Sequence, residues 1–375
     1  MIILHVFHSF WPVLGGIERA IYYLSKEFIR MGHEVIVLTS NYGSSNRPQM
    51  EFLDGIRVFR IKSKTLHFAQ LTIPLEKAPL DLINDADIVY AWDQTSFFTY
   101  TMIKEVKSRD KKVAMYFIGV DYLEHHYNTM IRFLGSKYQR WITKRISNLI
   151  DIAIVTTEHE RLLLKQRYNL DAIVIPHGVD KIYFELPNMA KEFRSKYHID
   201  NNKRIIAYIN RIHPTKGLDM LIKAFAIVSR KFPDLILVIA GKGDQKYLAK
   251  CLKLVEKLNI KDKVKYVGFL SEEDKIGLID ASELIIIPSK HAGENYSLVV
   301  DEVKARGKPL VVTNYGALPH RIQNHIEGIV VNANVNSLAE GIIYTLSNLK
   351  SFRIQTNPYT WDKIASELLE RILEV

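Results

Sequence analysis

Short apolar runs of strand length alternate with segments of helical periodicity along the chain, and this alternation limits the fold more than any other sequence feature. Residues 2–8 form such a run, the apolar residues of 17–31 recur at helical spacing, and residues 34–39 form the next run. Strand, helix and strand in this order make a βαβ unit. Residues 204–240 repeat the arrangement. The sequence therefore predicts an α/β protein with doubly wound parallel sheets.

A chain of 375 residues is too long for one core of ordinary size and suits two domains. We expect the boundary near residue 180, which gives domains of residues 1–180 and 181–358, followed by a last helix at about 359–375. The stretch 181–202 contains Pro187 and many charged residues, so we expect a linker with a short helix there.

Composition narrows the cellular setting and the partners. No apolar run approaches the roughly 18 residues of a membrane span, and the chain start lacks a basic signal-peptide pattern, so we expect a cytoplasmic protein. The single cysteine, Cys251, is expected to pack as a small apolar residue. A net charge of +10 favours an anionic partner. No zinc-finger, RNP or basic-zipper pattern is present, so nucleic acid is not expected and a nucleotide or an anionic surface remains.

The stretch 288–309 carries two acids at the end of a predicted strand. The apolar run 284–287 stops at Pro288, and Ser297 is a predicted N-cap for a helix over 298–306. Glu294 then lies in the loop and Glu302 on the helix. Both can reach the crevice beyond the carboxyl ends of the strands, where helix N–H groups favour an anionic ligand. Without further context, the alternative interpretation is that Glu294 is an ordinary loop acid and Glu302 a solvated acid on a helix.

Two further strand-to-helix turns are suited to phosphate. Gly15 and Gly16 lie in the first βα turn, where the absence of a Cβ lets a backbone approach a phosphate. Arg211 and Lys216 flank the turn after residues 204–209, where cations and helix amides can hold a diphosphate. A plain tight turn and ordinary solvated charges are the alternatives.

These segments together resemble the GT4-like family of retaining glycosyltransferases, which have the GT-B fold. The resemblance rests on Glu-x7-Glu from Glu294 to Glu302, Gly-Gly-x-Glu at 15–18, Arg-x4-Lys-Gly at 211–217 and Gly-Lys-Pro at 307–309. It implies two Rossmann-like doubly wound domains that face each other across a cleft, with the last helix packed back on the first domain.

The resemblance also implies roles for individual residues. Arg211 and Lys216 would stabilise the leaving diphosphate, Glu294 would contact the donor sugar, and these three are the candidate catalytic residues. Glu302 would contact the nucleotide ribose. The other donor-binding candidates are Gly15, Gly16, Gly241, Gly243, Gly268, Phe269, Asn295, Tyr296, Ser297 and Leu298. No covalent nucleophile, metal ion or other cofactor is expected.

The chain departs from the family pattern at two places. Asn295, Tyr296 and Ser297 stand where Gly-Phe-Gly is usual, which leaves the identity of the donor sugar open. Ile118 occupies the slot in which many family members have a histidine that touches the donor sugar. Asp121 and His125, with His126 beside it, are the candidates on the acceptor side.

Residues 131–150 form the most amphipathic segment of the sequence. Its apolar residues fall on one predicted face, namely Ile131, Leu134, Tyr138, Ile142, Ile146 and Leu149. Residues 132–148 include no acid. Two interpretations stay open: a packed helix with a solvated basic face, or a segment that contacts anionic lipid heads.

The leading hypothesis is a metal-independent retaining glycosyltransferase that moves a hexose from a UDP-sugar or GDP-sugar to a lipid-linked or saccharide acceptor. A lipid acceptor would place the enzyme at the inner face of the membrane as a peripheral protein. Two alternatives remain: a nucleotide-sugar epimerase of the same fold, which would need no acceptor, and a non-catalytic nucleotide-sugar-binding partner subunit.

Overall fold

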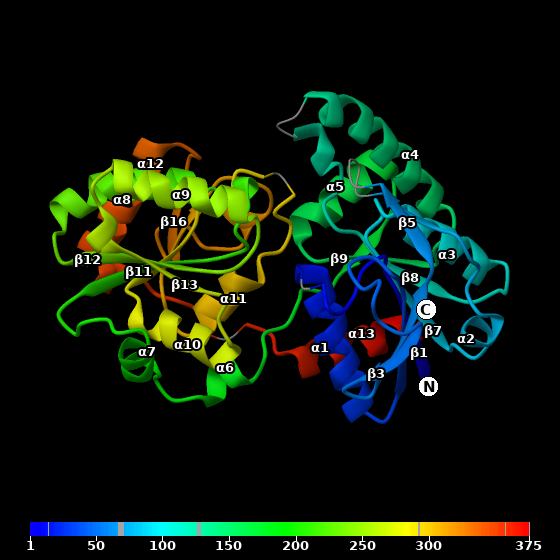
Figure 1. Cartoon of the computed structure of the whole chain (residues 1–375). Helices are drawn as coiled ribbons and strands as arrows, with labels where there is room; N and C mark the ends of the chain where they lie inside the picture. Colours follow the sequence, from blue (N-terminus) through cyan, green and yellow to red (C-terminus); the bar gives the residue numbers. More distant parts are fainter. Residues whose placement is uncertain (14, 67–70, 126–128, 292, 357, 375) are drawn as a thin grey trace. The chain divides into compact units, whose positions relative to one another are not determined.

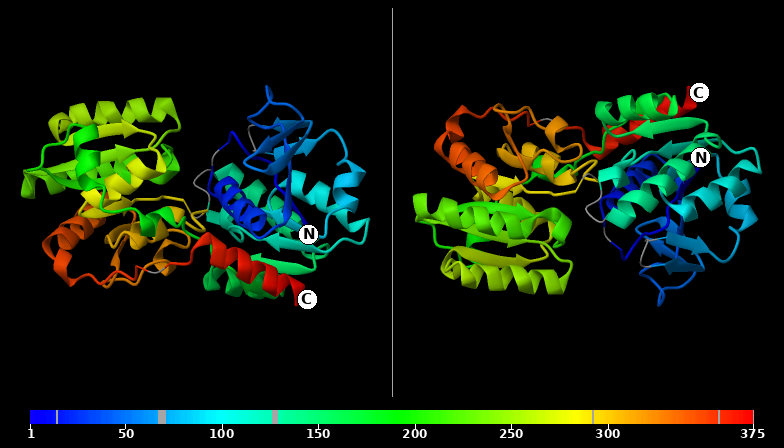
Figure 2. Two further views of the ribbon diagram at one scale, coloured as in Figure 1. Left: turned by 90° about the horizontal axis from the view of Figure 1, so that it is seen from below. Right: turned by 90° about the horizontal axis from the view of Figure 1, so that it is seen from above.

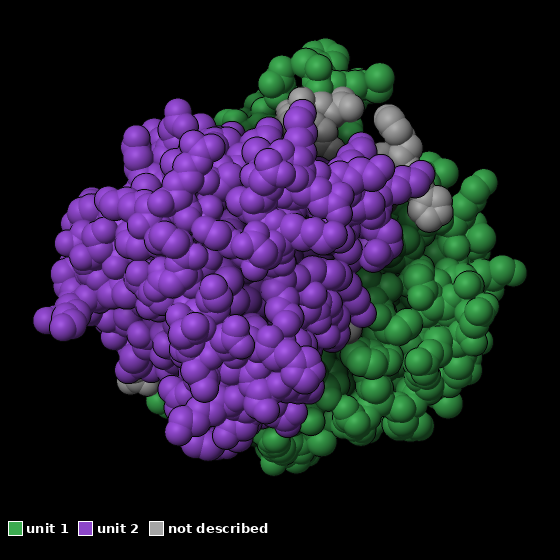
Figure 3. Space-filling view, turned by 60° about the vertical axis from the view of Figure 1, so that its left-hand side comes forward, with its two compact units in different colours: residues 1–178, 359–375 green, residues 179–358 purple. Residues whose placement is uncertain are grey.

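The computed structural model describes residues 1–13, 15–66, 71–125, 129–291, 293–356 and 358–374. The chain forms two compact units (Figures 1 and 3). Unit 1 comprises residues 1–178 and 359–375, and unit 2 comprises residues 179–358. Each unit has a parallel or mostly parallel sheet with helices on both faces, so the predicted α/β class with two Rossmann-like units is confirmed. None of the helices in the described ranges has the length and apolar character that crossing a membrane requires.

Unit 1 is built on an eight-stranded sheet of order β10-β9-β8-β7-β1-β2-β4-β3, in which only β3 is antiparallel to its neighbour. The strands are β1 (Ile2–Val6), β2 (Glu34–Ser40), β3 (Met50–Leu53), β4 (Ile56–Ile61), β7 (Ile88–Trp92), β8 (Val113–Tyr116), β9 (Ile152–Val155) and β10 (Ala172–Val174). The helices are α1 (Gly16–Arg30), α2 (Leu80–Asn84), α3 (Phe97–Lys107), α4 (Ser136–Ser147), α5 (Glu158–Tyr168) and α13 (Trp361–Leu373). A separate hairpin pairs β5 (Ser63–Leu66) with β6 (Leu71–Pro74).

Both faces of the unit 1 sheet are covered. On one face, α3 and α4 bury Phe98, Met102 and Ile142 against strand residues such as Leu4 and Val89. On the other face lie α1 and α13, which contact each other (Figure 2). Tyr23 of α1 stacks on Trp361 of α13, with 5.7 Å between the ring centres. The last helix of the chain is therefore part of the first unit.

Unit 2 is built on a six-stranded, wholly parallel sheet of order β13-β12-β11-β14-β15-β16. The strands are β11 (Arg204–Ile209), β12 (Leu235–Ala240), β13 (Val264–Gly268), β14 (Leu284–Ile287), β15 (Leu310–Thr313) and β16 (Gly328–Val331). The helices are α6 (Ile182–Glu185), α7 (Ala190–Lys196), α8 (Leu218–Lys231), α9 (Gln245–Lys257), α10 (Glu272–Ala281), α11 (Leu298–Ala305) and α12 (Val335–Ser347).

The helices of unit 2 also divide between the two faces of the sheet. Residues of α8, α9 and α12 form one core cluster with the sheet, and residues of α10 and α11 form a second cluster on the opposite face. Cys251 of α9 is buried in the first cluster, as predicted, and burial raises the pKa of its thiol to about 11. The cysteine is a packing residue.

The amphipathic segment 131–150 divides in two. Residues Ile131–Gly135 form a π-helical turn, here η2, which leads directly into α4. Ile142 and Ile146 are buried as predicted, but Leu134 is 56% exposed, so its assignment to the packed face was wrong. A π-turn places more residues in each turn than an α-helix, and this rotates Leu134 off the buried face.

Candidate active site

The loops that follow the two central strands of the unit 2 sheet lie next to each other at the carboxyl edge of the sheet. β11 and β14 are hydrogen-bonded neighbours, and the strand order runs from β11 toward β12 and β13 on one side and from β14 toward β15 and β16 on the other. This is the switch point of the doubly wound sheet, where the crevice beyond the carboxyl ends of the strands usually receives a ligand. A hydrogen bond of 2.7 Å from the Lys290 amide to the Thr215 carbonyl joins the two loops.

Lys216 and Glu294 meet in this crevice. The Lys216 Nζ lies 2.5 Å from Glu294 Oε2, and the Ser289 hydroxyl donates to the same oxygen at 2.9 Å. Glu294 is only 6% exposed. Burial would raise the pKa of Glu294, but the Lys216 ammonium and the Ser289 hydroxyl outweigh it and hold that pKa below its ordinary value. The site therefore contains an ionised carboxylate and a cation in contact.

The turn that carries Lys216 packs closely on the loop after β14. Gly217 has φ +70°, and a Cβ at this position would lie 1.9 Å from the Pro288 carbonyl oxygen. Only glycine satisfies both the left-handed backbone and the close approach. The glycine that ends the sequence pattern Arg-x4-Lys-Gly is thus required by the structure, because it allows the turn that carries Lys216 to lie beside Glu294.

Arg211 lies at the start of the same turn, with an exposed side chain. Its amide is held by the Asn210 side chain at 2.9 Å, while its guanidinium has no ion pair within the part of the chain that the structure describes. The neighbouring loop 241–244 runs beside this turn: Gly241 and Gly243 each lack room for a Cβ, and Gly243 pairs with Ile212. The two predicted glycines therefore allow two loops to run together.

The residues Asn295, Tyr296 and Ser297 lead into α11. Ser297 is its N-cap, as predicted, although the serine side chain does not cap the helix. The Tyr296 hydroxyl donates to Asp301 Oδ2 at 2.7 Å, and the Arg321 guanidinium lies over the Tyr296 ring at 3.5 Å and also pairs with Asp301. Leu298, the first helical residue, is partly exposed. The tyrosine ring thus belongs to a polar cluster under the loop.

Glu302 lies one turn into α11 and is held from a neighbouring helix. Its Oε1 is 2.8 Å from the Nζ of Lys275 on α10, and both side chains are nearly buried. Lys275 also pairs with Glu272 at 2.9 Å. The cation between two carboxylates was not found by sequence reasoning, because Lys275 has no motif and lies 27 residues before Glu302.

Gly268 is the last residue of β13 and Phe269 follows it, at the same edge of the sheet. The Gly268 carbonyl accepts from the Gly241 amide at 2.7 Å. The Phe269 ring is exposed, and the Lys242 ammonium lies 4.5 Å from its centre. The predicted donor-binding residues of unit 2 thus lie at the carboxyl edge of one sheet, in loops, at the end of β13 or in α11 up to Glu302.

In unit 1 the predicted glycines lie at the start of α1. Gly15 is its N-cap and Gly16 its first residue. A Cβ on Gly15 would lie 2.3 Å from the Glu18 carboxylate, whereas a Cβ on Gly16 would meet nothing within 4 Å. The Ser9 hydroxyl donates to Glu18 at 2.5 Å. Gly16 therefore leaves open space at a helix N-terminus.

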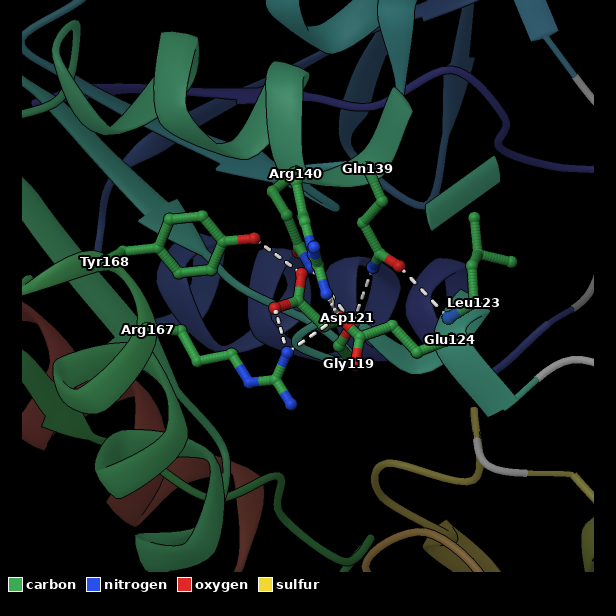
Figure 4. Close-up of polar contacts among 9 residues, drawn as sticks. Gly119, Asp121, Leu123, Glu124, Gln139, Arg140, Arg167 and Tyr168 are labelled. Atoms are coloured by element: carbon green, nitrogen blue, oxygen red, sulfur yellow. Dashed lines mark hydrogen bonds and ion pairs between the residues drawn. The ribbon is translucent and has the colours of Figure 1, made fainter. Parts of the chain in front are cut away.

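The acceptor-side candidates lie in the segment after β8, and Figure 4 shows Asp121 with its polar contacts. Asp121 is buried and accepts from the Tyr168 hydroxyl at 2.5 Å and from Arg167 at 3.2 Å. Arg167 and Arg140 both pair with Glu124, which is in the short helix η1 (Tyr122–His125). His125 is exposed, and His126 lies outside the described residues. The structure thus holds Asp121 in an ion-pair network and leaves His125 at the surface.

The backbone at Ile118 is fixed by residues that sequence reasoning missed. Gln94, fully buried after β7, accepts from the Ile118 amide at 2.8 Å and donates to the Ile118 and Gly119 carbonyls. Glu160 accepts from the Gly119 amide at 2.8 Å. Burial raises the pKa of Glu160 to about 7, although its hydrogen bonds favour the carboxylate. Gln94 lies two residues after the end of β7, and this position was the available signal.

Comparison with known proteins identifies relatives over nearly the whole chain. The family model described as "Glycosyltransferase Family 4" matches residues 14–181, and the model "Glycosyl transferases group 1" matches residues 189–357. An uncharacterised glycosyltransferase of Methanocaldococcus jannaschii is 24% identical, over 95% of this chain and 93% of its own. One component of the human phosphatidylinositol N-acetylglucosaminyltransferase is 24% identical, over 97% of this chain and 74% of its own.

A solved structure shows the same architecture. The Anabaena protein HepE, in complex with UDP-glucose, superposes with a TM-score of 0.77 at 17% identity and covers all of both chains. At this level of identity the likeness establishes the fold.

Proposed function

Because this chain is a glycosyltransferase of the GT4-like family with the GT-B fold, we propose that it transfers a hexose, with retention of configuration, from a UDP-sugar or GDP-sugar to a lipid-linked or saccharide acceptor. The observation that carries the proposal is the Lys216–Glu294 pair at the switch point of the unit 2 sheet. HepE binds UDP-glucose, and the human relative is named for transfer of N-acetylglucosamine to phosphatidylinositol. The first supports a nucleotide-sugar donor, and the second supports a lipid acceptor.

The charges at the site suit the electrostatics of glycosyl transfer. The donor's bond from the anomeric carbon to the phosphate oxygen breaks, and negative charge grows on the leaving diphosphate. Arg211 and Lys216 would lie beside that charge, and groups placed in advance where charge develops lower the barrier. The Arg211 side chain is exposed and available to a ligand. These cations would do what a metal ion does elsewhere, so activity should persist in EDTA.

Glu294 has two roles in this proposal. Without donor, its carboxylate neutralises Lys216 in a nearly buried place. With donor bound, the diphosphate would share Lys216, and the carboxylate would accept hydrogen bonds from sugar hydroxyls. The leaving phosphate would take the proton of the acceptor hydroxyl, so that the new bond forms on the face from which the old one leaves. Glu302 on α11 would accept from the ribose hydroxyls.

The experiment is a screen of nucleotide release with UDP-sugars and GDP-sugars, each with and without saccharide and lipid-linked acceptors, in buffer containing EDTA. A transferase releases UDP or GDP in proportion to a glycosylated acceptor. A product formed from the donor alone would indicate an epimerase, and donor binding without release under any acceptor would indicate a non-catalytic binding protein. Either result would overturn the proposal.

A further inference from the structure

We propose that the exposed face of η2 and α4 in unit 1 docks on an anionic lipid bilayer. This face, called the aromatic–basic ridge below, consists of Met130, Phe133, Leu134, Lys137, Trp141 and Arg145. The inference builds on the proposed function in that a membrane would present a lipid acceptor, but docking itself needs neither donor nor acceptor.

The ridge exposes an unusual amount of apolar surface for one short segment. The exposed fractions are 59% for Met130, 61% for Phe133, 56% for Leu134 and 45% for Trp141. Single exposed apolar residues are ordinary on soluble proteins, whereas a contiguous group marks an interaction site. The opposite face of the same helix is buried through Ile142 and Ile146, so α4 is already packed and the core does not need its outward residues.

Aromatic rings and cations alternate along the ridge. Phe133, Lys137, Trp141 and Arg145 follow one another four residues apart, so they line one side of the helix. The Lys137 ammonium lies 4.0 Å from the centre of the Phe133 ring, and the Arg145 guanidinium 5.8 Å from that of Trp141. On the adjacent α3, Lys104 lies over Tyr100, and the Tyr100 ring meets Trp141 at 6.0 Å. The aromatic–cation pairs thus continue across two helices.

This chemistry fits the boundary between lipid heads and acyl chains. Aromatic rings prefer the interface, long cationic side chains reach from it to the phosphates, and basic residues near an anionic leaflet each add binding free energy. Residues 130–148 contain five basic side chains and no acid. Glu124, which lies beside this segment, is already paired with Arg140 and Arg167. A net positive, apolar face is complementary to an anionic membrane.

A small pocket lies at the end of the ridge. It has a volume of about 370 Å³ and is lined by Glu124, Thr129, Arg132, Phe133, Ser136 and Arg140. Glu124 and Arg140 pair with each other on this wall and the Ser136 hydroxyl donates to the Phe133 carbonyl, so the Arg132 guanidinium and the Thr129 hydroxyl are the donors left for a phosphate. A lipid phosphate can therefore sit there while Phe133 enters the acyl region.

Vesicle flotation of the full chain tests docking without donor or acceptor. We compare vesicles of phosphatidylcholine with vesicles that also contain phosphatidylserine, and expect binding to the anionic ones that weakens with salt. The variant Lys137→Gln/Lys144→Gln/Arg145→Gln should bind roughly a hundredfold more weakly, because each cation contributes about fivefold. The control Lys250→Gln/Lys253→Gln/Lys257→Gln removes the same charge from the exposed face of α9 and should bind like wild type.

Fluorescence separates insertion from charge attraction. Anionic vesicles should shift the tryptophan emission to the blue. Trp141→Phe should abolish this shift, because Trp92 and Trp361 are buried in the core and Trp11 lies outside the ridge. The inference would be overturned if the protein bound both kinds of vesicle equally, or if the α9 control lost as much vesicle binding as the ridge variant. It would also be overturned if analytical sedimentation showed that the ridge forms a dimer of the protein instead. If vesicles bind but no nucleotide is released in the screen above, docking stands and the proposed function fails.

Discussion

Lys275 is the residue whose position most changes how the donor site is understood. Its ammonium lies between Glu302 and Glu272, nearly buried, so it fixes the carboxylate that we propose for ribose recognition. Without it, Glu302 would be a buried carboxylate lacking its cation, which is costly and favours the protonated form. Lys275 would then be a positioning residue that acts through Glu302.

We expect Lys275→Met to weaken binding of the nucleotide at least tenfold and to affect turnover at saturating donor much less. Titration calorimetry with UDP and GDP measures the first, and steady-state kinetics the second. Lys275→Arg, which keeps the charge, should restore most of the affinity. In a double-mutant cycle with Glu302→Gln, the second change should add little to the first. Additive losses would show that the two residues act separately.

His5 predicts a pH dependence of stability in unit 1. It is fully buried among aromatic rings, accepts from the Trp92 indole at 3.2 Å, and burial lowers the pKa of its imidazole from 6.5 to about 3. As the pH falls, His5 therefore becomes protonated near pH 6.5 in the unfolded chain but only near pH 3 in the folded chain. The stabilisation is complete above pH 6.5 and is lost as the pH falls through that interval.

Urea unfolding at pH 7 and pH 4.5 measures the contribution of His5. Linkage predicts that this histidine removes about 2.5 kcal/mol from the unfolding free energy of unit 1 between the two pH values. In His5→Phe the pH-dependent loss should be smaller by about that amount, whatever the absolute stability of the variant. The same pH dependence in both proteins would place the acid sensitivity elsewhere.

At the scale of elements, the sequence predicted the parts of the fold that carry strong periodicity. The apolar run 284–287, predicted as a strand, has the same bounds as β14, because buried parallel strands are short, continuous apolar runs. α3 was missed, since its eleven residues mix aromatic, hydroxyl and charged side chains without a clear stripe. The edge strand β3 and strand β5 were missed because half of the residues in each are exposed.

The residues of the candidate site also divide into those that the sequence predicted and those that it did not. Arg211, Lys216, Glu294 and Glu302 stand in motifs that can be read from the sequence. The contacts that fix the residues of the site depend on which elements the sheet brings together. Examples are the contacts of Ser289 with Glu294 and of Lys275 with Glu302, and the hydrogen bonds of Gln94 to the backbone at Ile118. Residues tens of positions apart share no local signal, so sequence reasoning could name the candidates but not the contacts that fix them.

Gly217 tests whether the turn after β11 must pack on the loop after β14. Gly217→Ala adds a Cβ where the Pro288 carbonyl lies and where φ is +70°. Because both the backbone strain and the clash must be relieved by moving the loops apart, we expect a loss of roughly 2 kcal/mol or more in stability and a strong loss of donor binding. Gly32→Ala, also at positive φ but with open space around it, is the matched control and should keep donor binding.

At the scale of the whole molecule, the chain passes between its units twice, near residues 178 and 358. α13 completes unit 1 by burying Trp361, Ile364, Ala365, Leu368, Leu369 and Ile372. Burial of a large apolar side chain contributes roughly 2 kcal/mol, so loss of these side chains from the core removes burial free energy comparable in size to the net stability of many domains.

Deletion of residues 359–375 should therefore destabilise unit 1 and leave unit 2 folded. In calorimetry we expect the unit 1 transition to disappear or to fall by more than about 10 °C, while the second transition is retained. Trp361→Ala, which removes one buried indole with its ring contacts to Tyr23 and His177 but keeps the rest of α13, should shift the same transition by less. A uniform shift of both transitions would contradict the assignment of α13 to unit 1.

The central claim is that Arg211 and Lys216 stabilise the leaving diphosphate, and turnover at saturating donor tests it most directly. Arg211→Ala removes an exposed cation, and Lys216→Gln keeps a hydrogen-bond donor for the nearly buried Glu294, so both variants should fold. Loss of one preorganised electrostatic contact costs on the order of 100-fold in rate. We predict losses of that size in both variants and near-normal turnover in Lys223→Ala, an exposed cation on α8. Near-normal turnover in Arg211→Ala and Lys216→Gln would contradict the placement of the diphosphate, and with it the account of this crevice as the active site.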